Sequence, residues 1–273
     1  MKPVWLRDRL VEADAAAVSL TNLGFTLGDG VFETIKLTAG EPFALTRHLN
    51  RLVASAHIAR IPPPDLGVVR AAVSAVCERH RADGFLRITL TAGDAPMSTP
   101  RHLLEPTLAV WVRPGGVSTE PVRVITTGWV RNERSPLTGA KSTSYAENSL
   151  ALAAAHEAGA GEALFANGVG ELCEGSTANV FVGFDDRLVT PPLSSGCLPG
   201  ITRALLLEAG VGVEERIPME RLGEASEMFL VSTGREVQPV VAIDDRLLPA
   251  CPGPLSTTAR RVWVERIASR LDP

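Results

Sequence analysis

The stretch that most constrains this chain is residues 140–151, where Lys141 precedes three hydroxyl residues and an Ala/Leu-rich segment. The hydroxyl residues Ser142, Thr143 and Ser144 favour helix starts, where their side chains accept hydrogen bonds from free backbone N–H groups. We therefore expect a helix to begin directly after Lys141. The positive end of a helix lowers the pKa of an adjacent amine, and a neutral amine is a nucleophile. Lys141 is thus a candidate nucleophile, although a lone lysine is more often a solvated surface residue.

Charge and hydropathy exclude several kinds of partner. The 273-residue chain has 27 Lys and Arg against 31 Asp and Glu, a formal net charge of −4. This balance gives no electrostatic reason to expect nucleic acid or an anionic membrane surface as a partner. The charged N-terminus lacks the apolar run of a signal peptide, and no apolar stretch reaches the roughly 20 residues that span a bilayer. We therefore expect a cytoplasmic protein that binds small molecules.

Cysteine and histidine spacing argues against a metal site. No two cysteines have the close spacing of metal-binding or redox pairs, so we expect reduced thiols. A metal hydrolase would be an enzyme of another class, but the five histidines contain no His-Glu-x-x-His or comparable spacing. We therefore predict that the protein holds no metal. The cysteines are Cys77, Cys173, Cys197 and Cys251.

Hydrophobic periodicity predicts an α/β chain of the α+β type in two domains. Residues 45–56 have apolar side chains at helical spacing, and Asp65 is a candidate cap for a second helix that ends near Arg81. The Pro- and Gly-containing segment 113–118 is the best linker candidate. We predict a small N-terminal domain over 1–114, a linker over 115–120 and a larger domain over 121–273. Expected strands are 31–37, 84–91, 106–112, 122–126, 162–166, 170–174, 179–182, 187–189, 227–232 and 237–243, and later helices end near 159, 209 and 271.

Two turns could hold a phosphate group. Gly200, Ile201 and Thr202 open a predicted helix, where free N–H groups and a hydroxyl form an anion cup. The turn Ser232-Thr233-Gly234 offers further donors that could close the same cup. Arg51, on the first predicted helix, would supply a full positive charge. The alternatives are an ordinary glycine-preceded helix cap and an arginine on a solvated helix face.

A carboxylate and a phenol complete the set of candidate residues. Glu174 ends an apolar strand, where it is either a surface charge or a buried partner for a cationic nitrogen. Tyr145, the only tyrosine, follows Lys141 by four residues and would lie near it on a helix. An amine, a phosphate cup and a buried carboxylate together suggest pyridoxal 5′-phosphate, bound through a Schiff base, with the carboxylate keeping the pyridine nitrogen protonated. A non-catalytic binder of a vitamin phosphate would need the cup without the lysine.

Several motifs, in one order along nearly the whole chain, resemble the fold-type IV pyridoxal-phosphate enzymes, the class IV aminotransferases. That family includes branched-chain and D-amino-acid aminotransferases, R-selective amine transaminases and 4-amino-4-deoxychorismate lyase. The motifs are Gly28-Asp29-Gly30-Val31-Phe32-Glu33-Thr34, His48-Leu49-Asn50-Arg51-Leu52, Lys141, Glu174-Gly175-Ser176-Thr177-Ala178-Asn179-Val180-Phe181, Pro199-Gly200-Ile201-Thr202-Arg203 and Ser232-Thr233-Gly234-Arg235-Glu236-Val237-Gln238-Pro239-Val240.

The resemblance implies a fold and a set of roles. The fold is a small N-terminal α/β domain and a larger C-terminal α/β pseudo-barrel domain, with the cofactor in the cleft, in a homodimer. Lys141 would form the Schiff base and then move the proton between substrate carbon and cofactor. Glu174 would pair with the pyridine nitrogen, and Tyr145 would donate to the cofactor's phenolic oxygen. The remaining cofactor contacts implied for this chain are Arg51, Gly200, Ile201, Thr202, Ser232 and Thr233.

The substrate is the least determined part of the resemblance. The strand Phe32-Glu33-Thr34-Ile35-Lys36 departs from branched-chain enzymes and looks like that of D-amino-acid aminotransferases, which makes Phe32 and Lys36 candidate substrate contacts. We therefore expect transamination between a small amino acid, the D-enantiomer, and a 2-keto acid. The alternative is the lyase that releases pyruvate and 4-aminobenzoate, because the Lys-x-x-x-Tyr spacing and residues 235–239 also look like chains called lyases. A branched-chain or R-amine transaminase is a further alternative.

One arginine stands out as a candidate ligand for the substrate carboxylate. Arg87 lies in an otherwise apolar strand, where a buried charge needs a partner, and a carboxylate would supply paired hydrogen bonds. A salt bridge within the fold would satisfy it equally well. Arg101 and His102 are adjacent and do not match the Arg-x-His pair of D-amino-acid aminotransferases. Arg235 is a second possibility, although an exposed side chain is expected there, and Gly234 would leave room for a bulkier substrate.

Overall fold

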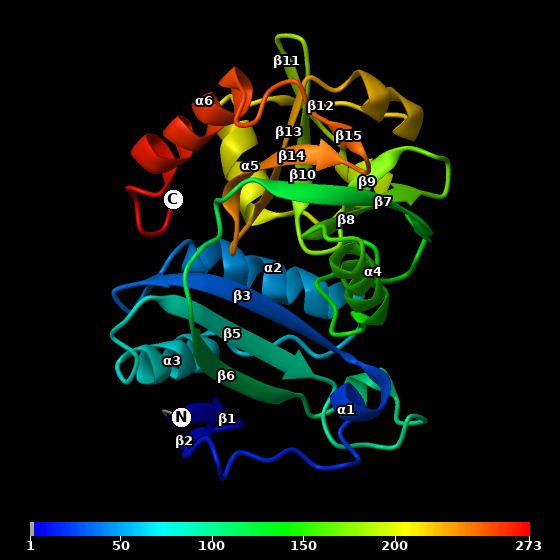
Figure 1. Ribbon diagram of the computed structural model, residues 1–273. Coiled ribbons are helices and arrows are strands. Elements are labelled where there is room, and N and C mark those ends of the chain that lie inside the picture. The colour runs from blue at the N-terminus through cyan, green and yellow to red at the C-terminus, as the bar shows by residue number, and fades with distance from the viewer. Residues whose placement is uncertain (1–2) are drawn as a thin grey trace. The chain divides into compact units, whose positions relative to one another are not determined.

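The computed structural model describes residues 3–273, which divide into two compact units (Figure 1). Unit 1 runs through Gly116 and also contains residues 140–145 and Asp272. Unit 2 contains residues 117–139 and 146–271, with Pro273. Residues 140–145 thus belong to unit 1 although they follow the predicted linker. The domain limits 1–114 and 121–273 stay a prediction.

Unit 1 is built on a six-stranded sheet of antiparallel pairs in the order β2-β1-β6-β5-β3-β4. The central strand β5 pairs along its whole length with β3 and β6, which places Thr34 opposite Arg87 and Arg87 opposite Trp111. Side chains alternate between the two faces of a strand, so these three side chains share one face. The strands are β1 Val4–Leu6, β2 Arg9–Val11, β3 Gly30–Thr38, β4 Glu41–Pro42, β5 Gly84–Thr91 and β6 Thr107–Pro114.

The helices of unit 1 bury their apolar faces against this sheet. α2 (Leu45–Ile58) packs on β3 and buries Leu49 and Leu52 completely. α3 (Leu66–Cys77) packs on β6, and its N-cap Asp65 accepts a hydrogen bond from the backbone N–H of Gly67 at 2.7 Å. The predicted cap is therefore confirmed, but the helix ends four residues before Arg81. The short helices of this unit are α1 (Leu23–Leu27) and the 3₁₀ turn η1 (Arg101–Leu103).

Unit 2 contains a nine-stranded mixed sheet in the order β12-β11-β10-β13-β14-β7-β8-β9, with β15 paired to β14. Three of its pairings are parallel: β11 with β12, β14 with β7, and β7 with β8. Strand β7 therefore lies between two strands that come later in the chain. The strands are β7 Val122–Arg131, β8 Glu162–Asn167, β9 Leu172–Gly175, β10 Asn179–Phe184, β11 Arg187–Thr190, β12 Val213–Glu214, β13 Glu227–Ser232, β14 Glu236–Ile243 and β15 Arg246–Leu247.

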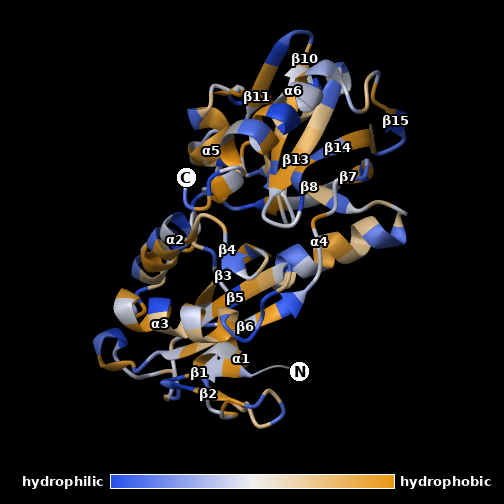
Figure 2. Cartoon of the chain, turned by 90° about the vertical axis from the view of Figure 1, so that its left-hand side faces the viewer, coloured by the Kyte–Doolittle hydropathy of each residue, from blue (hydrophilic) through white to orange (hydrophobic). Residues whose placement is uncertain are grey.

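The core of unit 2 follows from its nearly continuous apolar strands. Every residue of β10 is buried, and Figure 2 shows hydrophobic colouring along β10 and β13. The rings of Phe181 and Phe229, on these two strands, stack with centroids 5.0 Å apart. Mixed α/β architecture is thus confirmed. The helices are α4 Ala146–Glu157, α5 Ile201–Glu208, α6 Pro254–Val262, the 3₁₀ turns η2 Leu193–Ser195 and η3 Met219–Glu224, and the π turn η4 Trp263–Ile267.

Within residues 3–273, no helix is long and apolar enough to cross a membrane. In the same part of the chain, no group of three or more His, Cys, Asp and Glu side chains is arranged to hold a metal ion. The four cysteines are free thiols, and burial raises the pKa of Cys197 to about 12.

Candidate active site

In unit 1 the backbone of Lys141 is attached to the edge of strand β3. Its carbonyl accepts a hydrogen bond from the N–H of Phe32 at 2.9 Å, and its N–H donates to Ser55 Oγ at 3.0 Å. Two residues on, the N–H of Thr143 donates to the carbonyl of Gly30 at 2.8 Å. The lysine backbone is thereby fixed to both the sheet and helix α2.

The expectation that a helix begins directly after Lys141 is wrong. Helix α4 begins at Ala146, five residues later, because residues 141–143 make their backbone hydrogen bonds to β3 and Ser55 instead. The field of a helix end falls off within its first turn. The helix dipole therefore does not account for the chemistry of Lys141.

Two aromatic rings lie beside the lysine amine. Lys141 Nζ is 4.4 Å from the centroid of the Phe32 ring and 5.6 Å from that of Tyr145. The two rings contact each other edge to face, with centroids 5.4 Å apart. Tyr145 lies near Lys141, as predicted, but for a different reason, because neither residue is helical. The arrangement leaves the amine beside a phenol and against an apolar ring.

Arg87 projects from β5 onto the same phenylalanine. Its guanidinium carbon is 3.4 Å from the Phe32 ring centroid, Nε donates to Thr89 Oγ1 at 3.2 Å, and Nη1 donates to Thr34 Oγ1 at 3.4 Å. Burial lowers the pKa of Arg87 to about 10. Among the described residues, no carboxylate forms an ion pair with this arginine. The expected alternative, a salt bridge within the fold, is therefore not formed.

Arg51 belongs to a buried charged cluster with Glu33 and His48. Its Nε and Nη2 donate to the two carboxylate oxygens of Glu33 at 2.8 and 2.6 Å, and His48 Nδ1 lies 2.6 Å from Glu33 Oε2. Burial raises the pKa of Glu33, but Arg51 and His48 outweigh it and bring that pKa to about 2. Burial lowers the pKa of His48. The solvated-face alternative for Arg51 is thus wrong, since its side chain is only 10% exposed.

In unit 2 Glu174 is held at the end of β9. Its Oε2 accepts a hydrogen bond from the N–H of Leu198 at 2.9 Å, and Arg131 Nε lies 3.4 Å from Oε1. The guanidinium of Arg131 stacks over Phe165, 4.6 Å from the ring centroid. Glu174 is 9% exposed, so it is not the surface charge that was the alternative. A buried, anchored carboxylate of this kind fits a protonated pyridine nitrogen.

The start of α5 fits an anion. Gly200 is the N-cap and has no side chain to accept from the first free N–H groups, and no other side chain of the described residues caps this helix. Ile201 and Thr202 are 9% and 6% exposed, which shields these donors from water. α5 packs against β13, the strand that ends at Ser232. The helix start therefore has the donor set that a phosphate needs.

The predicted substrate residues differ in their surroundings. A Cβ at Gly234 would meet no atom of the described residues within 4 Å, so this turn is open. Lys36 lies four residues beyond Phe32 on β3, about 13 Å along the strand, so the structure does not bring it to Lys141. Arg101 forms an ion pair with Asp29. Arg235, expected to be exposed, is 15% exposed and pairs with Glu162.

The sequence patterns did not predict two charged residues that bind candidate site residues. Arg131 ends strand β7, and nothing in its neighbourhood in sequence points to Glu174. Glu162 is completely buried at the start of β8, where a charged residue resembles the polar end of a strand. Only the pairing of β7 with β8 and of β8 with β9 brings these side chains to their partners.

Comparison with known proteins places the chain in a family. The family model for amino-transferase class IV matches residues 30–243. The chain is similar to the D-alanine aminotransferase of Bacillus licheniformis, with 30% identity over 97% of each chain. Its structure is similar to the branched-chain aminotransferase of Thermoproteus uzoniensis with norvaline, with a TM-score of 0.87, 31% identity and coverage of 95% of this chain and 94% of that one.

A lyase is also among the similar structures. A putative 4-amino-4-deoxychorismate lyase from Legionella pneumophila has a TM-score of 0.84 and 25% identity, and the match covers 93% of this chain and 96% of that one. The match to the family model extends from the start of β3 to the end of β14, and so includes Lys141 and Glu174. The chain therefore belongs to the class IV aminotransferases, enzymes that use pyridoxal 5′-phosphate.

Proposed function

We propose that this enzyme transfers the amino group of a small D-amino acid to a 2-keto acid. The observation that carries the proposal is Arg87, a desolvated cation whose polar partners are the hydroxyl groups of Thr34 and Thr89. A buried charge of this kind is stabilised by an opposite charge, and a guanidinium binds a carboxylate through two parallel hydrogen bonds. Arg87 and Lys141 both contact Phe32, so an α-carboxylate on Arg87 lies near the amine.

Some residues of the chain bind the cofactor in this proposal, and Lys141 transfers the proton. Pyridoxal 5′-phosphate, when bound, supplies an electron sink for the charge that develops at the substrate α-carbon. Lys141 Nζ takes and returns the proton at that carbon, as a positioned general base and acid. Glu174 would hold a positive charge at the pyridine nitrogen, and the Tyr145 hydroxyl would donate a hydrogen bond to the phenolic oxygen.

The proposed phosphate contacts are backbone N–H groups and side-chain hydroxyl groups. The free N–H groups at Ile201 and Thr202, with the Thr202 hydroxyl, would bind the phosphate at the α5 start. Ser232 and Thr233 add hydroxyl donors from the β13–β14 turn. The resemblance to the class IV enzymes makes Arg51 a further candidate for the phosphate, and its two hydrogen bonds to Glu33 fix the orientation of its guanidinium.

The preference for a D-amino acid rests on similarity. The B. licheniformis relative is a D-alanine aminotransferase, and the strand Phe32–Lys36 lacks the pattern of branched-chain enzymes. The amine donor of an R-amine transaminase carries no carboxylate, so only its keto acid would engage Arg87. We further propose that the enzyme acts as a homodimer in the cytoplasm.

The lyase is the second candidate, favoured by the similarity to the putative lyase structure. It would use Lys141 and Glu174 in the same roles, and Arg87 would hold a carboxylate of aminodeoxychorismate. The two reactions differ in the fate of the substrate's amino group, which a transaminase passes to a keto acid and the lyase leaves in 4-aminobenzoate. A transaminase needs a keto acid to complete its cycle, and a lyase does not.

Visible absorption spectroscopy of the purified enzyme tests the proposal. We expect a visible cofactor band that bleaches with D-alanine and returns with a 2-keto acid, and that L-alanine leaves unchanged. The Lys141→Ala variant is the control, which should keep bound cofactor but lose turnover by at least about a hundredfold. Bleaching by L-alanine alone would contradict the D-preference. Release of pyruvate from aminodeoxychorismate, with no response to either alanine, would establish the lyase.

A further inference from the structure

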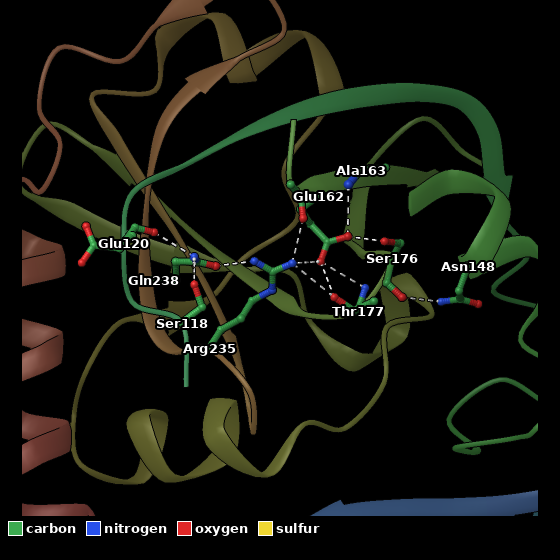
Figure 3. A network of polar contacts seen from close by, with 10 residues as sticks. Ser118, Glu120, Asn148, Glu162, Ala163, Ser176, Thr177, Arg235 and Gln238 are labelled. Carbon is green, nitrogen blue, oxygen red and sulfur yellow. Dashed lines mark hydrogen bonds and ion pairs between the residues drawn. The ribbon is translucent and has the colours of Figure 1, made fainter. Parts of the chain in front are cut away.

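Arg235 directly follows the turn Ser232-Thr233-Gly234, and its side chain enters the interior of unit 2 rather than solvent (Figure 3). We propose that Arg235 is a positioning residue for the cofactor phosphate. By binding Glu162, it holds this turn in a fixed position relative to Ser176 and Thr177, the loop residues that follow β9. The inference rests on the proposed phosphate contacts of Ser232 and Thr233.

Glu162 is the residue at the centre of the hydrogen-bond network that includes Arg235. It is completely buried, its Oε2 accepts from the N–H and hydroxyl of Thr177 at 3.2 and 2.5 Å, and its Oε1 accepts from the Ser176 hydroxyl. These contacts attach the loop after Glu174 to the start of β8. Ser176 is tied further to helix α4, because its carbonyl accepts from Asn148 Nδ2 at 2.7 Å.

Arg235 connects the turn to Glu162. Its Nη2 donates to Glu162 Oε2 at 3.1 Å and to the carbonyl of Gly161 at 2.8 Å, and its backbone N–H donates to the carbonyl of Ser232 at 3.2 Å. The same residue thus closes the turn through its backbone and anchors it through its side chain. A shift of the turn would break the contact with Glu162.

The other end of the guanidinium is held as well. Nη1 donates to Gln238 Oε1, and Gln238 Nε2 donates to the carbonyl of Glu120 at 2.8 Å and to Ser118 Oγ at 3.3 Å. The N–H of Ser118 donates to the carbonyl of Gly234 at 2.9 Å, so this series of hydrogen bonds ends at the turn itself. The turn is therefore held on both sides. Figure 3 shows the Arg235 side chain between Glu162 and Gln238.

The chemistry of the site favours arginine over lysine. A guanidinium is a planar fork with donors on both sides, so it reaches Glu162 and Gln238 together, whereas an ammonium is a single point charge. Loss of Arg235 would leave the Glu162 charge buried without a cation, which is strongly unfavourable. The structure can relieve this by moving the turn or the loop, and either movement displaces proposed cofactor contacts.

The test measures the dissociation constant of pyridoxal 5′-phosphate for the apoenzyme, by visible absorbance at equilibrium. We expect Arg235→Gln to raise it about tenfold, within the range of coupling between contacting residues. Arg235→Lys should fall between wild type and Arg235→Gln. Arg216→Gln is the matched control, because Arg216 forms an exposed ion pair with Glu171 in the same unit and should leave binding unchanged.

A double-mutant cycle separates positioning from general stability. Thr233→Ala removes a proposed phosphate contact, so adding it to Arg235→Gln should cost less than the product of the two single effects. Independent effects, or unchanged cofactor binding in both Arg235 variants, would overturn the inference. If Arg235→Gln does not fold, the cycle is run with Arg235→Lys. A wild-type protein that binds no pyridoxal 5′-phosphate would instead refute the proposed function.

Discussion

The guanidinium of Arg87 stacks on the ring of Phe32, with its carbon 3.4 Å from the ring centroid. Lys141 Nζ is 4.4 Å from the same centroid, so one phenylalanine contacts both the proposed proton carrier and the proposed carboxylate ligand. Cation–π contact stabilises a desolvated cation without neutralising it. Phe32 therefore keeps Arg87 charged and available to an anionic substrate.

Arg87→Gln should lower kcat/KM for the amino acid substrate about tenfold to a hundredfold, the cost of losing a charge-assisted pair. The loss should appear mainly in KM, because the carboxylate is bound throughout the reaction. Steady-state kinetics with D-alanine and with an amine that lacks a carboxylate checks this, and the amine should be unaffected. Arg113→Gln is the control, since Arg113 stacks on Phe85 from the neighbouring strand and is exposed. Equal losses for both substrates would count against a carboxylate contact.

Glu174→Gln should lower kcat roughly a hundredfold, in the range found when a preorganised electrostatic group is removed. A neutral amide still accepts from the N–H of Leu198 but cannot hold a proton at the pyridine nitrogen. Single-turnover kinetics and the cofactor's absorption maximum report the change. Glu147→Gln is the control, because Glu147 also faces Arg131, at 3.7 Å, but is exposed. A fully active Glu174→Gln enzyme would remove this residue from the mechanism.

Gly200→Ala and Gly234→Ala should behave differently. A Cβ at Gly200 would lie 1.9 Å from Asn179 Oδ1, whereas one at Gly234 meets open space. We expect Gly200→Ala to lower the free energy of unfolding by about 1–3 kcal/mol, as overpacking does, and to weaken cofactor binding. Gly234→Ala should change neither property. Chemical unfolding and cofactor titration of the two variants provide the comparison, and equal behaviour would contradict it.

Glu33→Gln should destabilise the protein by about 3–5 kcal/mol at neutral pH, because it leaves Arg51 as a buried charge without its carboxylate. The pKa of Glu33 falls from 4.5 in the unfolded chain to about 2 in the fold. Its ionised form therefore stabilises the fold above pH 4.5, and this contribution is lost as the pH falls toward 2. Urea unfolding from pH 7 to pH 3 should show the difference between wild type and variant shrinking at acid pH.

The matched control for Glu33 is Glu265→Gln, which removes an exposed ion pair with Arg261. Such pairs contribute at most about 1 kcal/mol, so this variant should follow wild type at every pH. A difference between wild type and Glu33→Gln that stays constant from pH 7 to pH 3 would contradict the low pKa of Glu33.

Local signals in the sequence were enough to select the candidate site residues, whose roles stay a prediction. Lys141 and Glu174 stand beside short motifs, and the glycine before α5 marks a helix start by its residue type alone. The family assignment was predicted from the order of these motifs and is confirmed by the match over residues 30–243. The local patterns also predicted helix α2 and the N-cap Asp65, because capping and amphipathic spacing are properties of neighbouring residues.

Contacts between distant segments were not predictable in this way. Ser142, Thr143 and Ser144 have the composition of a helix cap, yet Gly30 supplies a partner for Thr143 and the helix begins at Ala146. Arg235 was expected to be exposed, because its partner Glu162 is 73 residues away and joins it only through the folded sheet. Tertiary contacts override the local helix or strand propensity of a segment wherever such a distant partner exists.

The attachment of residues 140–145 to strand β3 has a consequence for the nascent chain during translation and for truncated fragments of the protein. When only the first 116 residues have been synthesised, the N–H of Phe32 and the carbonyl of Gly30 cannot yet form their hydrogen bonds with Lys141 and Thr143. An open strand edge is a site for association with other chains. A fragment that stops at Gly116 would therefore keep that edge exposed permanently, whereas the growing chain covers it about 27 residues later, within a few seconds of translation.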